Sequence, residues 1–106
     1  MKIADPSVFV GELTTVGRRT GHARTVELRM IRLNGKFYAT SSNVERKHWC
    51  RNMIAHPGVA VAAGGERFSC SARRVEEEDL RREVLTLRDS PPQLGRVVFE
   101  FTPVGK

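Results

Sequence analysis

Apolar and polar residues alternate over several short stretches of the chain, which is the spacing of β-strands with one buried face. In residues 25–33 the apolar positions are Val26, Leu28 and Met30. Glu27 falls between them, on the opposite face. We therefore predict a half-buried strand over residues 25–33.

Turn residues separate these stretches and indicate how the strands connect. Asn34-Gly35 directly follows the strand just described, and this pair favours a tight hairpin because both turn positions need a positive φ. Gly64-Gly65 marks a second hairpin in the same way. The strands predicted from the pattern cover residues 12–16, 25–33, 36–41, 59–63, 67–75 and 96–102.

One longer stretch departs from alternation and takes helical spacing. Residues 45–56 bring Trp49 and Met53 onto one stripe, beside Cys50 and Ile54. Residues at this spacing share one face of a helix. We therefore predict a helix over residues 45–56 that is buried through these four side chains.

A second helix is predicted over residues 77–87, where acidic residues suit the positive end of the helix dipole. Its expected buried residues are Leu80, Val84 and Leu87. Six strands in hairpin order with two short helices between them indicate a mostly β fold, an antiparallel barrel rather than a parallel α/β sheet. Residues 1–106 contain no linker or repeat, so we expect a single domain.

The balance of charge points to an anionic partner. The chain has 18 basic and 12 acidic residues, a net charge of +6, which attracts nucleic acid, acidic lipid or a phosphorylated small molecule. No apolar run approaches the roughly 18 residues that span a bilayer, and the N-terminus lacks the pattern of a secretory signal. We expect a cytoplasmic protein without a membrane span, in which Cys50 and Cys70 are free thiols.

The basic residues gather most closely after the first strand. Arg18, Arg19 and Arg24 occur within eight residues that contain no acid, between and beside Gly17 and Gly21. Guanidinium groups and free backbone N–H groups on a glycine-flanked bend are suited to a phosphate or carboxylate. The alternative is a solvated basic loop. The spacing matches neither a P-loop nor a GxGxxG motif.

Polar residues also follow the third strand. Ser41-Ser42-Asn43 could hydrogen-bond the edge of a heterocycle, and Trp49 could cover its face. The alternative is that Asn43 caps the following helix and that Trp49 belongs to the core.

Chemistry carried by the protein itself has little support in the sequence. No pair among the histidines and cysteines has the spacing of a zinc site, so we expect no metal. No GxSxG motif occurs, and the chain is poor in general acids and bases, so no catalytic residue is assigned. This composition favours chemistry supplied by a bound cofactor.

Four motifs follow one another along the chain. They are LTTVGRRTG at residues 13–21, Arg24-Thr25-Val26, then Ser42-Asn43 with Trp49 and Asn52, and AHPGVAV at residues 55–61. In this order they resemble the deazaflavin-dependent nitroreductase family, which belongs to the flavin-binding split β-barrel superfamily that also holds pyridoxamine phosphate oxidase. The match runs from about residue 13 to residue 75 and resumes weakly at residues 97–104.

The resemblance implies a split β-barrel and the cofactor coenzyme F-420, a deazaflavin with a phosphate and an oligoglutamate tail. It assigns the phosphate and tail to the basic loop, the ring to the next strand and the following strand end, and a pocket wall to Trp49. The cofactor-binding residues implied are Arg18, Arg19, Thr20, Gly21, Arg24, Thr25, Val26, Glu27, Leu28, Thr40, Ser41, Ser42, Asn43 and Trp49. Glu27 stands where the family usually has proline.

The hypothesis that follows is an oxidoreductase that transfers hydride from reduced F-420 to a small electron-poor acceptor, such as a quinone or nitro compound. An FMN-binding protein of the same superfamily is the nearest alternative. A basic β-barrel that binds single-stranded nucleic acid is an alternative of another class, and it would need outward-facing aromatic residues. We also expect a homodimer, because a six-stranded barrel is filled by its own side chains and a tricyclic ring must lie outside it.

Overall fold

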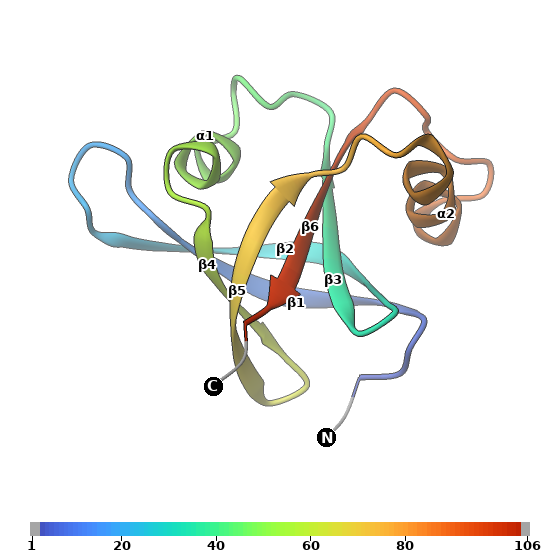
Figure 1. Cartoon of the computed structure of the whole chain (residues 1–106), viewed down its shortest axis with the longest axis horizontal. Helices are drawn as coiled ribbons and strands as arrows, with labels where there is room; N and C mark the ends of the chain where they lie inside the picture. The colour runs from blue at the N-terminus through green and yellow to red at the C-terminus, as the bar shows by residue number, and fades with distance from the viewer. Residues whose placement is uncertain (1–2, 105–106) are drawn as a thin grey trace.

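The computed structural model of the chain describes residues 3–104 and contains six strands and two helices (Figure 1). Their order is β1 (Ser7–Val16), β2 (Ala23–Leu33), β3 (Lys36–Ser41), α1 (His48–Ala55), β4 (Gly58–Ala63), β5 (Glu66–Arg74), α2 (Glu78–Arg88) and β6 (Val97–Pro103). The mostly β fold with two short helices is confirmed.

The strands form one closed antiparallel barrel in the order β1-β2-β3-β6-β5-β4, with β4 pairing back to β1. The turn between β2 and β3 is the predicted one, and Asn34 and Gly35 have φ values of 54° and 77°. Both of their N–H groups donate to the carboxylate of Asp5, at 2.9 and 2.7 Å. The β2–β3 and β4–β5 turns lie toward one end of the barrel, and both helices lie toward the other (Figure 1).

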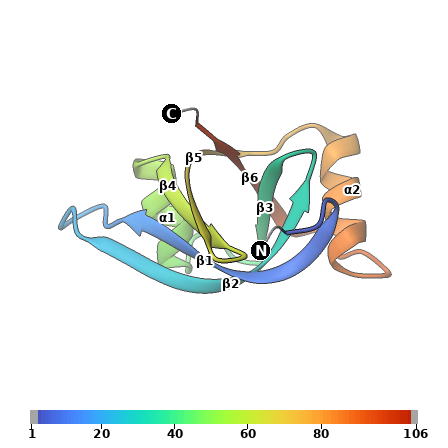
Figure 2. The ribbon, with the colours of Figure 1, turned by 90° about the horizontal axis from the view of Figure 1, so that it is seen from below.

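Strand β1 is longer than the sequence predicts, since it starts at Ser7 rather than at residue 12. Val8 and Val10 are exposed, so the apolar face of this segment is not distinguished by alternation. Gly11 permits the close approach of β4, because a Cβ there would lie 2.9 Å from the carbonyl oxygen of Ala62. Strands β1 and β2 pair along the whole length of β1 and form a long ribbon, whose loop end projects beyond the barrel (Figure 2).

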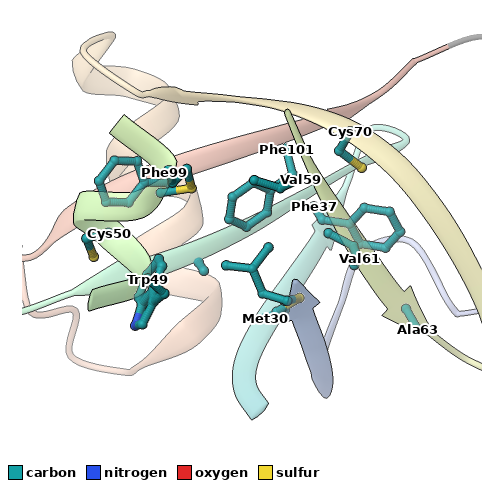
Figure 3. Close-up of a cluster of buried hydrophobic side chains, with 13 residues drawn as sticks. Met30, Phe37, Trp49, Cys50, Val59, Val61, Ala63, Cys70, Phe99 and Phe101 are labelled. Carbon is teal, nitrogen blue, oxygen red and sulfur yellow. The ribbon is translucent and has the colours of Figure 1, made fainter. Parts of the chain in front are cut away.

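The barrel interior is filled by apolar side chains from all six strands (Figure 3). Helix α1 adds Trp49, Cys50 and Met53 to this cluster, and the Trp49 ring meets the Phe99 ring edge-on at 6.0 Å. A second cluster lies outside the barrel, where α2 covers residues of β2, β3 and β6.

The predictions for both helices need correction. Helix α1 begins at His48 rather than at residue 45, because Asn43 accepts the N–H of Arg46 and residues 44–46 form a turn. Ile54 was expected on the buried stripe but is 63% exposed, since α1 packs only its other face on the barrel. In α2, Leu85 is fully buried beside Val84. Leu85 was not among the residues predicted to be buried.

The two cysteines are free and buried. Burial raises the pKa of Cys70 to about 11 and also raises the pKa of Cys50. A thiol acts as a nucleophile only as the thiolate, so neither cysteine has the properties of a reactive one. In the part of the chain that the structure describes, neither helix is long and apolar enough to span a bilayer.

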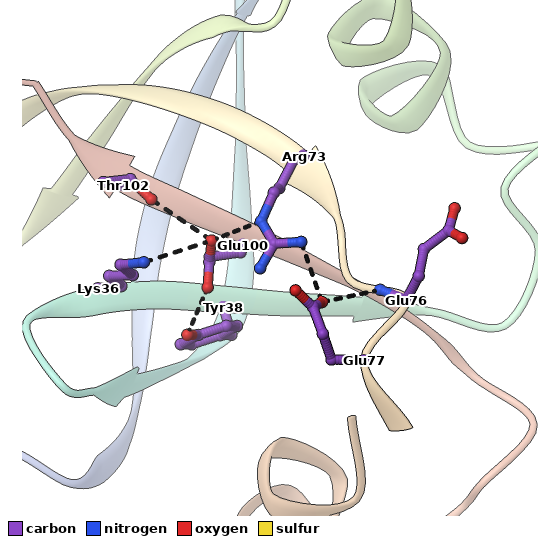
Figure 4. Close-up of polar contacts among 7 residues, drawn as sticks. All are labelled: Lys36, Tyr38, Arg73, Glu76, Glu77, Glu100 and Thr102. Atoms are coloured by element: carbon purple, nitrogen blue, oxygen red, sulfur yellow. Dashed lines mark hydrogen bonds and ion pairs between the residues drawn. The ribbon is translucent and has the colours of Figure 1, made fainter. Parts of the chain in front are cut away.

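A buried carboxylate joins β3, β5 and β6 (Figure 4). Glu100 is 2% exposed and accepts hydrogen bonds from the Tyr38 hydroxyl at 2.7 Å and from Arg73 Nε at 2.8 Å. Lys36 Nζ lies 3.6 Å from the same carboxylate. Burial would raise the pKa of Glu100, but the hydrogen bonds from Arg73 and Tyr38 outweigh it and the pKa is lowered.

We expect Glu100→Gln to lower the free energy of unfolding by about 1–3 kcal/mol at neutral pH, because two hydrogen bonds lose their charge assistance. The folded-state pKa of Glu100 is lowered. Its carboxylate therefore stabilises the fold above the unfolded-state pKa of about 4.3, and this contribution is lost as pH falls through the folded-state pKa. The variant should lose less stability on acidification, which urea unfolding between about pH 2 and 7 measures.

Glu78 provides a matched control, because it pairs with Arg81 and Arg82 on the exposed side of α2. Glu78→Gln should change the free energy of unfolding by less than about 1 kcal/mol. Equal losses in both variants would contradict a special role for the buried carboxylate.

Candidate functional site

A pocket of about 830 Å³ lies outside the barrel, between the loop that joins β1 to β2 and helix α1. It is lined by Thr15, Gly17, Arg18, Arg19, Thr20, Ala23, Arg24, Thr25, Val26, His48, Trp49, Arg51 and Asn52. Its volume is in the range of pockets that hold cofactors.

Two glycines shape the loop of this pocket. The Gly17 N–H donates to the His22 carbonyl at 2.7 Å, and the Gly21 N–H donates to the Gly17 carbonyl at 2.8 Å. Gly21 has a φ of 75°, which glycine adopts without strain. A Cβ at Gly17 would lie 3.0 Å from the Thr20 hydroxyl and 3.1 Å from the His22 carbonyl. The bend therefore needs glycine at both ends.

A buried amide attaches this loop to the helix. Asn52 is 3% exposed, and its Oδ1 accepts both the Arg18 backbone N–H at 3.2 Å and Arg18 Nη1 at 2.9 Å. Its Nδ2 donates to the hydroxyl of Thr15 at 3.3 Å. One side chain of α1 thereby fixes the end of β1 and the first arginine of the loop.

The pocket is strongly basic. Arg18, Arg19 and Arg24 come from the loop and the start of β2, and Arg51 comes from α1. Partial burial and the positive charges of Arg51 and Arg19 lower the pKa of Arg18. Among the described residues, no Asp or Glu lines this pocket. The positive charges of these guanidinium groups repel one another, and a bound anion would reduce that repulsion.

Trp49 was predicted either as a wall of the pocket or as a core residue, and it is both. It is only 7% exposed and packs in the core, yet it also lines the pocket. The predicted residues Thr20, Thr25 and Val26 line the pocket as well.

The polar residues at the end of β3 and directly after it do not line this pocket. Thr40 accepts a hydrogen bond from Arg96 Nε at 2.7 Å, and buried Ser41 accepts the Asn43 N–H at 3.1 Å. Asn43 accepts the Arg46 N–H, so it begins the turn that precedes α1, and Ser42 is exposed. Their contact with a ring stays a prediction.

Three other predicted residues also lie outside the pocket lining, namely Gly21, Glu27 and Leu28. Glu27 is exposed and pairs in register with Glu12 on the outer face of the barrel, where it lines a shallow groove. The acid is therefore not among the arginines.

The family model for F420H(2)-dependent quinone reductase matches residues 6–94, which is most of the chain. The chain belongs to this family. The resemblance stated from the motifs is confirmed, and the family is one of oxidoreductases. None of the curated proteins matches the chain in sequence.

Solved structures share the fold of this chain. A protein described as a domain-swapped dimer is 26% identical with a TM-score of 0.66, over 95% of this chain and 84% of its own. The F-420-H2 dependent reductase FDR-A is 24% identical with a TM-score of 0.71, over 95% and 98%. A Listeria innocua protein provisionally named a pyridoxamine 5′-phosphate oxidase is 15% identical with a TM-score of 0.74, over 91% and 84%. The split β-barrel is confirmed.

Six residues of this family member line the pocket although they were not predicted there, namely Thr15, Gly17, Ala23, His48, Arg51 and Asn52. The last three have helical spacing and share one face of α1. That spacing was visible in the sequence, but it does not indicate which face of the helix meets the loop. Residues 3–104 contain no group of three His, Cys, Asp or Glu side chains arranged to hold a metal ion.

We expect Asn52→Ala to release the basic loop, because the Arg18 backbone N–H loses its acceptor. Native-state hydrogen exchange of the Arg18 amide should accelerate, and the free energy of unfolding should fall by about 1–3 kcal/mol. Asn43→Ala removes an exposed amide near the same helix and should leave Arg18 exchange unchanged. If the Arg18 amide exchanges hydrogen at the same rate in Asn52→Ala as in the parent, Asn52 does not hold the loop in place.

Proposed function

We propose that this protein binds coenzyme F-420 in the basic pocket and transfers hydride to a small electron-poor acceptor, such as a quinone or nitro compound. One observation carries the proposal. Four arginines and a buried tryptophan line one pocket of a chain that belongs to the F-420-dependent quinone reductase family.

The residues of the pocket fit the cofactor in charge. Arg18, Arg19, Arg24 and Arg51 present guanidinium groups, which suit a phosphate and the carboxylates of a glutamate tail. The bound deazaflavin would supply the hydride chemistry. Arg18 is held by Asn52, so it offers a fixed charge, whereas Arg19 and Arg24 are exposed.

The protein contributes binding and orientation. Trp49 gives an apolar wall whose position is fixed by its packing on Phe99. Thr25 and Val26 line the pocket from β2, and Thr25 is oriented by a 2.8 Å hydrogen bond with Thr14. An ordered wall of this kind holds a planar ring against a second reactant and displaces water from its face.

Binding of FMN is the nearest alternative. FMN carries one phosphate and no glutamate tail, so it would use only part of a pocket lined by four arginines. Nucleic-acid binding has less support, because Phe37, Phe99 and Phe101 are buried in the barrel and are not available to stack on bases. The two free thiols are compatible with a reducing cytoplasm.

We expect Arg19→Ala to weaken F-420 binding by about tenfold or more, since a charge-assisted hydrogen bond is worth roughly 1.5–3 kcal/mol. Binding should also weaken as salt is raised, because exposed charges are screened within about 10 Å at 0.1 M ionic strength. Fluorescence titration with F-420 measures both effects.

Two controls distinguish the loss of a specific contact with the anionic part of F-420 from a general loss of structure. Arg74→Ala removes the same charge from β5, outside the pocket lining, and should leave affinity nearly unchanged. A deazaflavin without phosphate and tail should bind Arg19→Ala as well as it binds the parent. The assignment is wrong if Arg18→Ala, Arg19→Ala and Arg24→Ala all bind intact F-420 as tightly as the parent.

We further propose that the protein acts as a homodimer. The pocket lies on the outside of a filled barrel, so one chain walls it only in part. A structure that is 26% identical to this chain is described as a domain-swapped dimer. A second subunit would complete the wall on the open side of the pocket.

Sedimentation at micromolar concentration should give twice the chain mass of 11.9 kDa. Because dimerisation and cofactor binding are linked in this proposal, the apparent affinity for F-420 should fall when the protein is diluted below the dimer dissociation constant. A strict monomer that binds F-420 at every concentration would exclude the dimer while leaving the cofactor assignment intact.

A further inference from the structure

His48 lies in the wall of the basic pocket, on the same face of α1 as Asn52. It is the first residue of the helix, and its side chain is exposed to solvent. Among the described side chains that line this pocket, it alone is of a type that changes its charge near neutral pH, because the ordinary pKa of histidine is about 6.5 and arginine stays protonated.

One ring nitrogen of His48 faces the fixed arginine of the loop. Arg18 Nη1 lies 3.5 Å from His48 Nδ1 and 2.9 Å from Asn52 Oδ1. A guanidinium group can only donate hydrogen bonds, so Nδ1 is the acceptor and the neutral ring carries its proton on Nε2. Protonation of Nδ1 would turn this acceptor into a second cationic donor beside Arg18. An oxygen of a bound anion can then accept hydrogen bonds from both groups.

The surroundings of His48 are positively charged. The first turn of α1 contains no acidic residue and no side chain caps its N-terminus, so the positive end of the helix dipole is not compensated there. An anion that binds beside the ring would compensate this charge and favour the protonated ring, as an opposite charge within about 4–6 Å does. The charged residues around His48 come from the loop, β2 and α1, and they are Arg18, Arg19, Arg24, Lys47 and Arg51.

We propose that His48 is an anion-binding residue of this pocket and that it takes up a proton from solvent when the anion binds. The protonated ring and the Arg18 guanidinium then donate to the same phosphate or carboxylate group. The inference rests on the proposed function only in that an anion occupies the basic pocket. Because the bound state holds one proton more than the free state, affinity for the anion rises as pH falls through the range in which histidine titrates.

Sulfate is a suitable probe, because it keeps both of its negative charges across the pH range in which histidine titrates. An NMR titration at constant ionic strength gives its Kd from the amide signals of Arg18, Thr20 and Arg51. The parent protein should bind sulfate about threefold or more tighter at about pH 5.5 than at about pH 8. His48→Gln should bind it with nearly the same Kd at both pH values.

Two further variants distinguish the charge of His48 from its shape. His56→Gln makes the same substitution at the other end of α1, outside the pocket lining, and should keep the pH dependence of the parent. His48→Lys carries a positive charge throughout this range. It should bind sulfate at about pH 8 as tightly as the parent does at about pH 5.5. A merely structural role for His48 would not produce this recovery.

The proposal is overturned if sulfate causes no saturable shift at the pocket, if the parent binds it equally at both pH values, or if His48→Gln keeps the parent's pH dependence. A parallel fluorescence titration compares F-420 binding by the parent and His48→Gln, so that any titration of F-420 itself cancels. If sulfate shows the expected effect and F-420 does not bind, the proposed function fails and the role of His48 stands. If F-420 binds both proteins with the same pH dependence, the role of His48 fails and the proposed function stands.

Discussion

The interior of a closed six-stranded barrel is only wide enough for its own side chains, and this constraint decides where the molecule can bind anything. Leu13, Met30, Val61, Phe99 and Phe101 are among the buried side chains that pack inside it. Ligands are therefore left with the outer surface and the two ends. The β1–β2 ribbon extends past the barrel, and α1 packs beside it, so the space between them becomes the main pocket.

The charge of that pocket depends on a neutral side chain. Arginines that are free to move would separate, because like charges repel. Asn52 holds Arg18 at two points and is itself held by Thr15, so one cation of the cluster is fixed before a ligand arrives. A site ordered in advance spends less binding free energy on its own arrangement. The packing of α1 on the barrel therefore helps to position the arginines of the pocket, because it fixes Asn52.

The fold was largely predictable because its determinants are local. Alternation and the Asn34-Gly35 turn predicted the strands to within a few residues, apart from the start of β1, where Val8 and Val10 face outward. The arginine loop was predictable for the same reason. The α1 side of the pocket depends on which helix face meets the loop, and a linear pattern does not contain that information. Asn52 was present in a motif, but its role as a tether appears only in three dimensions.

The barrel does not have equal strength around its circumference. Strand β1 is paired with β2 at ten positions but with β4 at only three, from residue 12 to residue 14. Among the described ladders that no hairpin turn connects, this is the shortest, since β3–β6 and β5–β6 have five pairs each. The cylinder can thus come apart along one seam while the ribbon stays whole. The closure of the barrel therefore rests on the few backbone hydrogen bonds between β1 and β4, while the β1–β2 hairpin is held by a long ladder of its own.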